Sequence, residues 1–507
     1  MDQLFTELKN MKNENIDNYS LNTVIGKRGY TILKEELTSK EIFEIRKELT
    51  VKPFINKEYG LEPTPFPVYC ESTRKLYLPR YYGLNKFGPP KLNKLDSGKS
   101  INITFSKSLK PKQIPIVDEF MKVVSNQNIG GGLISVPCGY GKTVIALYLC
   151  ALLKVKTLVV VHKEFLVNQW KERIKEFIPD AKIGKIQSNK IYIDGYDIVI
   201  GMLQSISMIE YNQDIFNDFG FVIYDECHHL GAETFSKALL KTGTKYTLGL
   251  SATPQRQDGL SKVFHWYLGD MVYLIKKREE ENVKVKIIKY YDSNEDYSKE
   301  ILNFKGNPNS AQMINRICDY EPRTNLIIKE THQRLLEGRK ILILSDRREH
   351  LKVIKSKLDE IPKYTSGFYL GGMKEKDLNE TETKDVILGT FSMASEGFDC
   401  KYPLDTIILT SPKTNIEQAV GRILRQEAKD RKFVPLIIDI FDEFSLFAKQ
   451  ALKRVKFYQK NNYKMEVYRD NILQEEESKS INEKSSRKKT NKFKKSDVEE
   501  LDFLPDD

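Results

Sequence analysis

The sequence lacks the usual features of secreted and membrane proteins. Its six cysteines, at positions 70, 138, 150, 227, 318 and 400, include no Cys-x-x-Cys pair, which argues against a disulfide framework and a structural zinc site. The longest apolar run covers ten residues, 144–153, whereas a membrane-spanning helix needs about 20. The first ten residues carry acids and no apolar core, which excludes a signal peptide. We therefore expect a protein of a reducing, intracellular compartment without membrane contact.

The composition is that of a folded protein with a polar surface. Hydrophobic residues make up 40% and charged residues 30% of the 507 residues, which excludes a fibrous chain and sustained disorder. A chain of this length suggests about three domains.

Positive charge is concentrated near the N-terminus. The formal net charge is +11 at pH 7, and residues 1–112, with 20 basic and 13 acidic residues, carry +7. Residues 474–507, with 8 basic and 10 acidic residues, carry −2. A polyanionic partner such as nucleic acid would explain the surplus. A general bias towards Lys, Asn and Ile explains it equally well, so charge alone leaves both interpretations open.

Residues 1–108 are predicted to form a small accessory domain. A helix is expected over residues 37–49, with a Thr38/Ser39 cap signal and Glu41 in its first turn. Cations interleaved with aromatic rings are suited to contact phosphates and to stack on bases of a nucleic acid. The segment after this helix interleaves cations with aromatic residues in this way: Arg74, Lys75, Arg80 and Lys86 lie among Tyr77, Tyr81, Tyr82 and Phe87. An aromatic core edge with solvated lysines would have the same composition.

From about residue 113, short apolar runs alternate with amphipathic stretches. Buried strands of a parallel sheet have this pattern, and the helical stretches between them imply βαβ units. The first series lies at 133–136, 156–161, 196–201, 221–225 and 246–251, and the second at 340–345, 385–390, 405–410 and 435–440. We predict two tandem α/β domains, 109–280 and 319–473, joined by a linker over 281–318. The polar segment at 276–300 has the pattern of a strand plus linker. Residues 474–507 have too few apolar residues to fold and are predicted to be a disordered tail.

The first α/β domain contains a candidate phosphate-binding loop. The strand at 133–136 leads through PCGYGKT into a long apolar helix. Glycines at such a turn let backbone N–H groups approach phosphates at the helix N-terminus, while the lysine reaches the β/γ-phosphates and the Thr hydroxyl binds Mg²⁺. The expected nucleotide-binding residues are Val136, Pro137, Cys138, Gly139, Tyr140, Gly141, Lys142 and Thr143.

Two acids follow a later strand of the same domain. The strand at 221–225 ends in Asp225, and Glu226 and His228 come next. An acid at the carboxyl end of a buried parallel strand, beside a phosphate loop, is suited to hold Mg²⁺, and the next acid to polarise an attacking water. The alternative is a strand-end turn with two solvated carboxylates, which the order of the motifs disfavours.

Four motifs, in this order, resemble those of the superfamily 2 helicases and translocases: VPCGYGKT, DECH, SATPQRQDG (251–259) and QAVGRILRQ (418–426). The resemblance covers about residues 109–460. SATPQRQDG and the YLGGMKEKDL segment (369–378) are similar to the group containing XPB, the phage helicase UvsW and the poxvirus transcript-release helicase. Three departures stand out: Val136 replaces the usual Gly or Ala, DECH replaces DEAH or DEAD, and the TSGFYLGG stretch (365–372) departs from the family pattern.

The resemblance implies two RecA-like parallel-sheet domains that bind ATP and Mg²⁺, together with the accessory domain and tail. In that family Lys142, Thr143, Asp225 and Glu226 match the catalytic and Mg²⁺-binding residues. Further implied residues are Gln113 at adenine, His228 coupled to Ser251 and Thr253, Gly397 and Asp399 near ribose, and Gln418, Gly421, Arg422 and Arg425 closing over the nucleotide. Arg422 or Arg425 would be the arginine finger.

The resemblance also implies a nucleic-acid partner gripped through its backbone, which positions the protein without reading bases. The expected contacts are His162, Lys163, Gln204 and Thr390. The predicted function is an ATP-driven motor on duplex DNA or a DNA–RNA hybrid, with an RNA helicase as the alternative. A catalytically dead binding module and a restriction-type motor with a nuclease are the other classes; intact motifs oppose the first, and the absence of a nuclease-like segment opposes the second.

The segment LPRYYGLNKFGPP (78–90) and the Asn/Lys/Ile bias further suggest a large cytoplasmic DNA virus. The chain would then act in the host cytoplasm or the virion, or in the nucleus, and transcription machinery is an expected partner.

Overall fold

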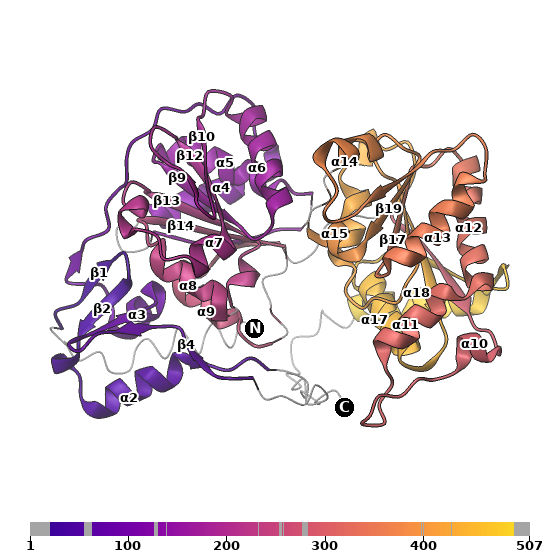
Figure 1. The fold of residues 1–507 in the computed structure, drawn as a ribbon, viewed down its shortest axis with the longest axis horizontal. Coiled ribbons are helices and arrows are strands. Elements are labelled where there is room, and N and C mark those ends of the chain that lie inside the picture. The colour runs from indigo at the N-terminus through magenta and orange to yellow at the C-terminus, as the bar shows by residue number, and fades with distance from the viewer. Residues whose placement is uncertain are drawn as a thin grey trace. The chain divides into compact units, whose positions relative to one another are not determined.

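The computed structural model divides the chain into two compact units, Met1–Lys276 and Lys277–Asp507 (Figure 1). The described residues are 21–54, 63–125, 130–137, 139–231, 233–252, 256, 258–275, 282–396, 398, 400–426 and 428–490. Each unit is built around its own large sheet, in agreement with the predicted pair of α/β domains.

The large sheet of the first unit has the strand order β11-β10-β12-β9-β13-β14-β8-β15. β11 is antiparallel to β10, and the other neighbouring strands described pair in parallel. β8, β9 and β12 are buried along their whole length, which explains their uninterrupted apolar sequences. The strands are β8 (Gly131–Ser135), β9 (Thr157–Val161), β10 (Ile183–Gln187), β11 (Lys190–Tyr192), β12 (Ile198–Met202), β13 (Phe221–Asp225), β14 (Tyr246–Ser251) and β15 (Met271–Leu274).

The helices of this sheet lie between its strands in the sequence, as the βαβ pattern predicts, except for the first helix, which precedes β8. They are α4 (Ile114–Val124), α5 (Lys142–Leu153), α6 (Glu164–Phe177), α7 (Leu203–Met208), α8 (Glu233–Lys241) and α9 (Ser261–Leu268). All five strands predicted for this domain are present at the expected places.

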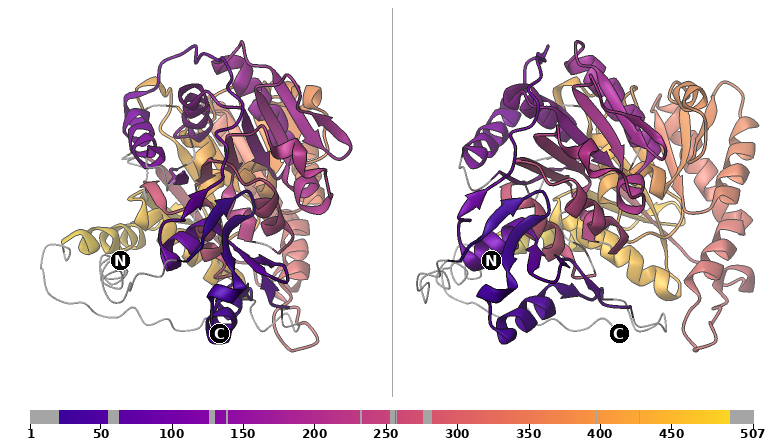
Figure 2. Two further views of the ribbon diagram at one scale, coloured as in Figure 1. Left: turned by 90° about the vertical axis from the view of Figure 1, so that its left-hand side faces the viewer. Right: turned by 60° about the vertical axis from the view of Figure 1, so that its left-hand side comes forward.

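The N-terminal domain has a separate sheet with the order β5-β6-β2-β1-β7. Its strands are β1 (Val24–Gly26), β2 (Gly29–Leu33), β5 (Cys70–Glu71), β6 (Lys75–Leu78) and β7 (Leu92–Asn93), and β3 (Thr50–Val51) pairs with β4 (Phe66–Pro67). The predicted helix is α2 (Ser39–Glu48), which begins with a reciprocal capping box between Thr38 and Glu41. A second helix, α3 (Arg80–Phe87), packs against α9, and Figure 2 shows these indigo elements beside the magenta ones.

For part of the Arg- and Tyr-rich segment of this domain, the structure favours the second interpretation, an aromatic core edge. Arg80, Tyr81 and Tyr82 are buried at the contact with the large sheet. The Arg80 guanidinium donates a hydrogen bond to the carbonyl of Lys245 over 2.9 Å, and one apolar cluster runs continuously through both domains. These three residues therefore attach the N-terminal domain, while Arg74 and Lys75 stay exposed.

The sheet of the second unit has the order β18-β19-β17-β20-β21-β16-β22-β23. β23 is antiparallel to β22, and the other described neighbours pair in parallel. The strands are β16 (Lys284–Tyr290), β17 (Ile341–Ser345), β18 (Ser366–Tyr369), β19 (Val386–Thr390), β20 (Thr406–Leu409), β21 (Leu436–Asp442), β22 (Lys464–Arg469) and β23 (Ile472–Leu473). The helices are α10 (Glu295–Ser298), α11 (Ser310–Asp319), α12 (Glu321–Leu336), α13 (Arg348–Asp359), α14 (Glu375–Thr381), α15 (Phe391–Glu396), α16 (Glu417–Val420), α17 (Ser445–Lys460) and α18 (Glu475–Thr490).

Residues 281–318 do more than link the two sheets. β16, within this segment, lies between β21 and β22 inside the second sheet, and α10 and most of α11 also belong to it. The strand expected in this polar segment is therefore present as β16 (KVKIIKY), and its apolar side chains Val285, Ile287 and Ile288 are buried.

The predicted disordered tail begins with a helix, α18, over residues 475–490. Side chains on α18 complete the open edge of β22: the Asn482 amide bonds both the N–H and the C=O of Met465, at 3.1 and 2.8 Å, and the Ser478 hydroxyl accepts from the N–H of Val467 at 2.9 Å. Polar contacts, rather than an apolar face, fix this helix, so the composition does not reveal it. Residues 491–507 lie outside the described part of the chain. No helix in the described part is long and apolar enough to cross a membrane.

Candidate functional site

The phosphate-loop candidate connects β8 to α5, as predicted. Gly139 and Gly141 have φ angles of 79° and 88°, in the left-handed region that only glycine adopts without strain. Gly141 forms the N-cap of α5, so the helix begins at Lys142 with its N–H groups directed at the loop. Val136 is buried in the apolar core, and this position explains why an aliphatic residue fits there. Cys138 lies outside the described residues.

The Gln113 side chain forms a hydrogen bond with this loop. Its amide nitrogen donates to the carbonyl of Tyr140 over 3.0 Å, and its amide oxygen accepts from the N–H of Lys110 over 2.9 Å. A Cβ atom on Gly141 would come within 2.3 Å of the Gln113 nitrogen, so the close contact itself requires glycine. The contact of Gln113 with adenine stays a prediction.

The two predicted acids lie beside the loop lysine. Asp225 ends β13, and Glu226 follows with a φ of +48°, a conformation that turns its side chain back towards the loop. The Lys142 ammonium lies 3.2 Å from Glu226 Oε1, with 13% of each side chain exposed. Burial would raise the pKa of Glu226, but Lys142 and His228 outweigh it and lower that pKa below its usual value. Glu226 is therefore ionised at neutral pH.

The Asp225 carboxylate is held through both oxygens. Oδ2 accepts from the indole Nε1–H of Trp170 at 2.9 Å, and Oδ1 accepts from the N–H of Glu226 at 3.1 Å. Burial and the adjacent Glu226 charge raise the pKa of Asp225. A cation near this carboxylate would offset both effects.

Three histidines lie next to one another beside Glu226. His228 Nδ1 lies 3.1 Å from the Ser251 hydroxyl and 3.4 Å from Glu226 Oε2, the geometry that the predicted coupling requires. The His229 ring packs between His228 and His162, with centroid distances of 4.3 and 4.0 Å. Burial lowers the pKa of all three, that of His229 to about 3, so they are neutral at pH 7. Thr253 lies outside the described residues.

Arg256 and Trp170 also belong to the site, although the sequence analysis assigns neither of them a role. The Arg256 guanidinium donates to the carbonyl of His228 and to Asp258 Oδ1 at 2.9 Å. The carbonyl of Asp258 accepts from the backbone N–H of Phe54 at 3.0 Å, so the N-terminal domain contacts the segment after β14 directly. A basic residue following SATP is a usable signal for Arg256, whereas Trp170 has the sequence pattern of an ordinary core residue.

The predicted backbone-contacting residues of the first unit have different surroundings. His162 is 5% exposed and stacks on His229, a position that does not favour phosphate contact. Lys163 is partly exposed and Gln204 exposed, and the Gln204 amide donates to the carbonyl of His162 at 2.9 Å. Lys163 and Gln204 thus follow β9 and β12 at the same edge of the sheet as the phosphate loop.

The second unit holds its predicted arginines close to the end of α15. Arg422 Nε donates to the carbonyl of Ala394 at 2.5 Å, and Arg425 donates to the carbonyl of Phe398 at 2.6 Å. Gln418 lies one turn earlier, in α16, and Thr390 ends β19. Gly397 and Asp399 are outside the described residues.

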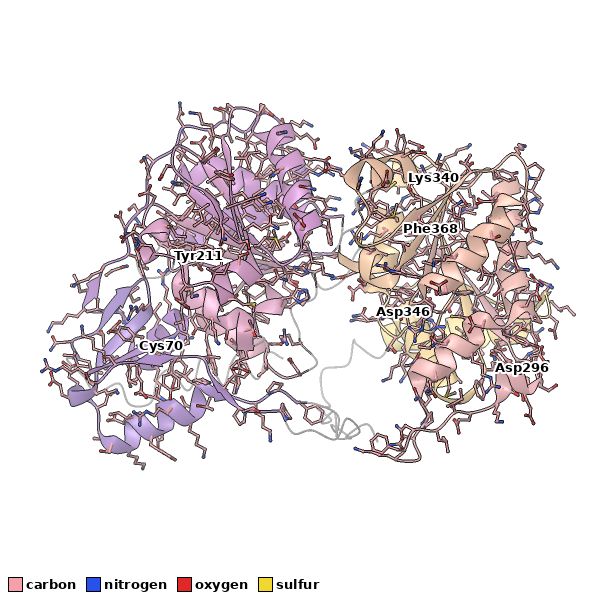
Figure 3. All side chains as sticks on the ribbon, viewed as in Figure 1. Cys70, Tyr211, Asp296, Lys340, Asp346 and Phe368 are labelled. Carbon is pink, nitrogen blue, oxygen red and sulfur yellow. The ribbon has the colours of Figure 1, made fainter. Side chains whose placement is uncertain are left out.

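An ion pair and a hydrogen bond connect the loops that follow β17 and β20 in the second unit. Asp346, labelled in Figure 3, follows β17; its carboxylate lies 3.1 Å from the Lys413 ammonium, and its N–H donates to the Ser411 hydroxyl. The loops after β17 and β20 therefore form one surface at the carboxyl edge of the sheet.

Comparison with known proteins gives two consistent matches. Residues 106–256 match the family model described as "Type III restriction enzyme, res subunit", which covers the phosphate loop and the acids. The chain is 37% identical over 460 residues to "Putative ATP-dependent RNA helicase L396" of Acanthamoeba polyphaga mimivirus, covering 89% of this chain and 87% of the relative. The chain belongs to this family of viral ATP-dependent helicases.

Further relatives of the helicase are viral. It is 26% identical over 352 residues to "Putative ATP-dependent RNA helicase QP509L" of African swine fever virus, covering 64% of this chain and 68% of the relative. It is 28% identical over 338 residues to "Probable helicase D10" of Escherichia phage T5, covering 64% and 71%. The crystal structure of T4 UvsW aligns over 85% of this chain and 96% of its own at 18% identity, with a TM-score of 0.34, which is too low to argue from. The family model and the sequence relatives confirm the predicted superfamily 2 helicase, an ATP-dependent enzyme acting on nucleic acid.

Proposed function

We propose that the viral helicase hydrolyses ATP at the site formed by the β8–α5 loop and the end of β13, and uses the energy to move along a nucleic-acid backbone. The observation that carries this assignment is the Lys142–Glu226 contact at 3.2 Å. It brings the loop lysine and the candidate general base together, although 84 residues separate them in the sequence.

The side chains present fit a magnesium ion bound together with nucleotide phosphates. Mg²⁺ prefers oxygen ligands and is usually bound by one or two carboxylates plus phosphates. Asp225 and the Thr143 hydroxyl supply such oxygens, and the described residues contain no cluster of three or more acidic, His or Cys side chains that would hold a metal alone. Bound Mg²⁺ would neutralise charge on the phosphates.

Each residue of the first unit then has a role that its surroundings support. Lys142, at the N-terminus of α5, binds the β/γ-phosphates. Glu226, ionised at neutral pH, accepts a proton from the attacking water. His228 links Glu226 to Ser251 on β14, so that a change at the nucleotide shifts the segment after SAT.

Arg422 or Arg425 is proposed to act as the arginine finger when ATP is bound. Their support is the matching motif and their place beside the end of α15, with both guanidinium groups already oriented by backbone carbonyls. Gln418 is proposed to act with them at the nucleotide.

Duplex DNA or a DNA–RNA hybrid is the proposed substrate, because SATPQRQDG resembles the DNA translocases of the XPB and UvsW group. An RNA helicase is the second candidate, favoured by the names of the mimivirus and African swine fever virus relatives. A role in viral transcription or genome maintenance, in host cytoplasm or virion, accords with either substrate.

The test is the ATPase rate of the full chain with duplex DNA, single-stranded DNA, DNA–RNA hybrid and RNA. Stimulation by duplex DNA or hybrid supports the first substrate, and stimulation by RNA alone supports the second. An ATPase that no nucleic acid stimulates would contradict the proposed motor.

A further inference from the structure

Trp170 is a buried residue whose polar atom touches the proposed catalytic site. It lies in the middle of α6, is 1% exposed, and belongs to the apolar cluster that includes side chains of β8, β9 and β13. The indole N–H is a donor without acceptor capacity, and a buried Trp generally finds a partner for it. Here the partner is the carboxylate of Asp225, at 2.9 Å.

This hydrogen bond fixes the orientation of the Asp225 carboxylate. The N–H of Glu226 holds Oδ1, but it comes from the next residue of a strained turn and moves with it. The indole holds Oδ2 from a different element, a helix packed on the sheet. Rotation of the carboxylate would break one of these bonds, so the pair of donors selects one rotamer.

We propose that Trp170 is a positioning residue that orients Asp225 for Mg²⁺, and that it acts through its N–H as well as through the volume of its ring. The inference rests on the proposed role of Asp225. Groups that orient metal ligands commonly change metal affinity by about 10- to 100-fold when they are removed, and a donor that stabilises the ionised carboxylate belongs to this class.

A spectroscopic experiment observes the N–H directly. The chain has two tryptophans, Trp170 and Trp266, so ¹⁵N-tryptophan-labelled protein gives two indole signals, and Trp266→Phe identifies the one from Trp170. We expect the Trp170 signal to move when Mg²⁺ is added to the ADP-bound protein, and to move again in Asp225→Asn, because an amide oxygen is a weaker acceptor. A Trp170 signal that is unchanged in both experiments would overturn the proposal.

A second experiment separates positioning from packing. Trp170→Phe retains an aromatic ring and loses the N–H; the matched control is Trp266→Phe, since Trp266 is half-buried in α9 and packs edge-on against Tyr82. For Trp170→Phe we expect the Mg²⁺ concentration that half-saturates the ATPase to rise about tenfold or more, with kcat recovered in excess Mg²⁺. The control should keep the wild-type Mg²⁺ requirement.

The outcomes distinguish this inference from the site assignment. A Trp170→Phe protein with wild-type Mg²⁺ dependence, beside an Asp225→Asn protein that has lost it, would overturn the role of Trp170 alone. If Asp225→Asn also kept wild-type Mg²⁺ dependence, the assignment of Asp225 itself would be wrong. Should Trp170→Phe fail to fold, the indole signals of the wild-type and Asp225→Asn proteins still decide the question.

Discussion

Replacing Arg80 by Ala should destabilise the first unit without changing nucleic-acid contacts. The Arg80 side chain is buried, donates to the Lys245 carbonyl at 2.9 Å, and lies over the Tyr81 ring. A hydrogen bond from a charged donor contributes about 1.5–3 kcal/mol, and the cation–π contact adds about 0.5–1 kcal/mol. We therefore expect a loss of about 2–4 kcal/mol.

The assay is denaturant unfolding followed by selective tryptophan fluorescence. Both tryptophans of the chain belong to the first unit, so their emission reports on that unit, and Trp266 lies at the same interface as Tyr82. Arg74→Ala is the matched control, because Arg74 is an exposed arginine of the same domain, and exposed substitutions usually change stability by less than about 0.5 kcal/mol.

The two arginines should also differ in how they affect nucleic-acid binding. If Arg74 and Lys75 touch phosphates, their joint replacement should lower the log–log salt slope on duplex DNA by roughly 0.9 for each contact, with stability unchanged. An Arg80→Ala protein of wild-type stability that binds DNA with a reduced salt slope would refute this account, since it would place Arg80 on the nucleic acid.

Four further outcomes test the site. Lys142→Ala should abolish ATP turnover, because the phosphates lose their main cationic contact; wild-type turnover would show that the loop is misassigned. Glu226→Gln should bind ATP normally and hydrolyse it slowly, and equilibrium nucleotide binding measured beside turnover checks both halves of this expectation. Arg425→Ala should lower kcat by about 10³-fold and leave nucleotide affinity nearly unchanged, so a large loss of affinity would argue for a binding role instead. Because burial lowers the pKa of His229 to about 3, the unfolded chain takes up a proton there first, and stability should fall as the pH drops from about 6.5 towards 3; His229→Phe should reduce this acid sensitivity in unfolding curves.

The parts of the fold that the sequence predicts are those governed by local pattern. β8, β9 and β13 are buried on both faces, so their apolar runs are unambiguous, and the glycines of the phosphate loop have φ angles that only glycine accepts readily. The acids at the end of β13 are equally predictable, because the carboxyl ends of parallel strands lie at the same edge of the sheet as the phosphate loop.

The parts that escape prediction depend on partners distant in the sequence. The sequence context of Arg80 is that of a surface cation. Its burial depends on a hydrogen bond to the carbonyl of Lys245, which lies 165 residues away in the sequence. Trp170 has the sequence pattern of a core residue. Its hydrogen bond to Asp225, 55 residues away, cannot be inferred from that pattern. A strand is expected within the polar segment that holds β16, but its place between β21 and β22 depends on strands that follow much later in the sequence.

The helix α18 protects an edge that would otherwise favour self-association. A strand with unpaired N–H and C=O groups is a template for pairing with another chain, and Asn482 and Ser478 occupy those groups on Met465 and Val467 in place of a neighbouring strand. A chain ending at residue 473 would leave that half of β22 open, so loss of the charged segment should appear first as aggregation of an otherwise active enzyme.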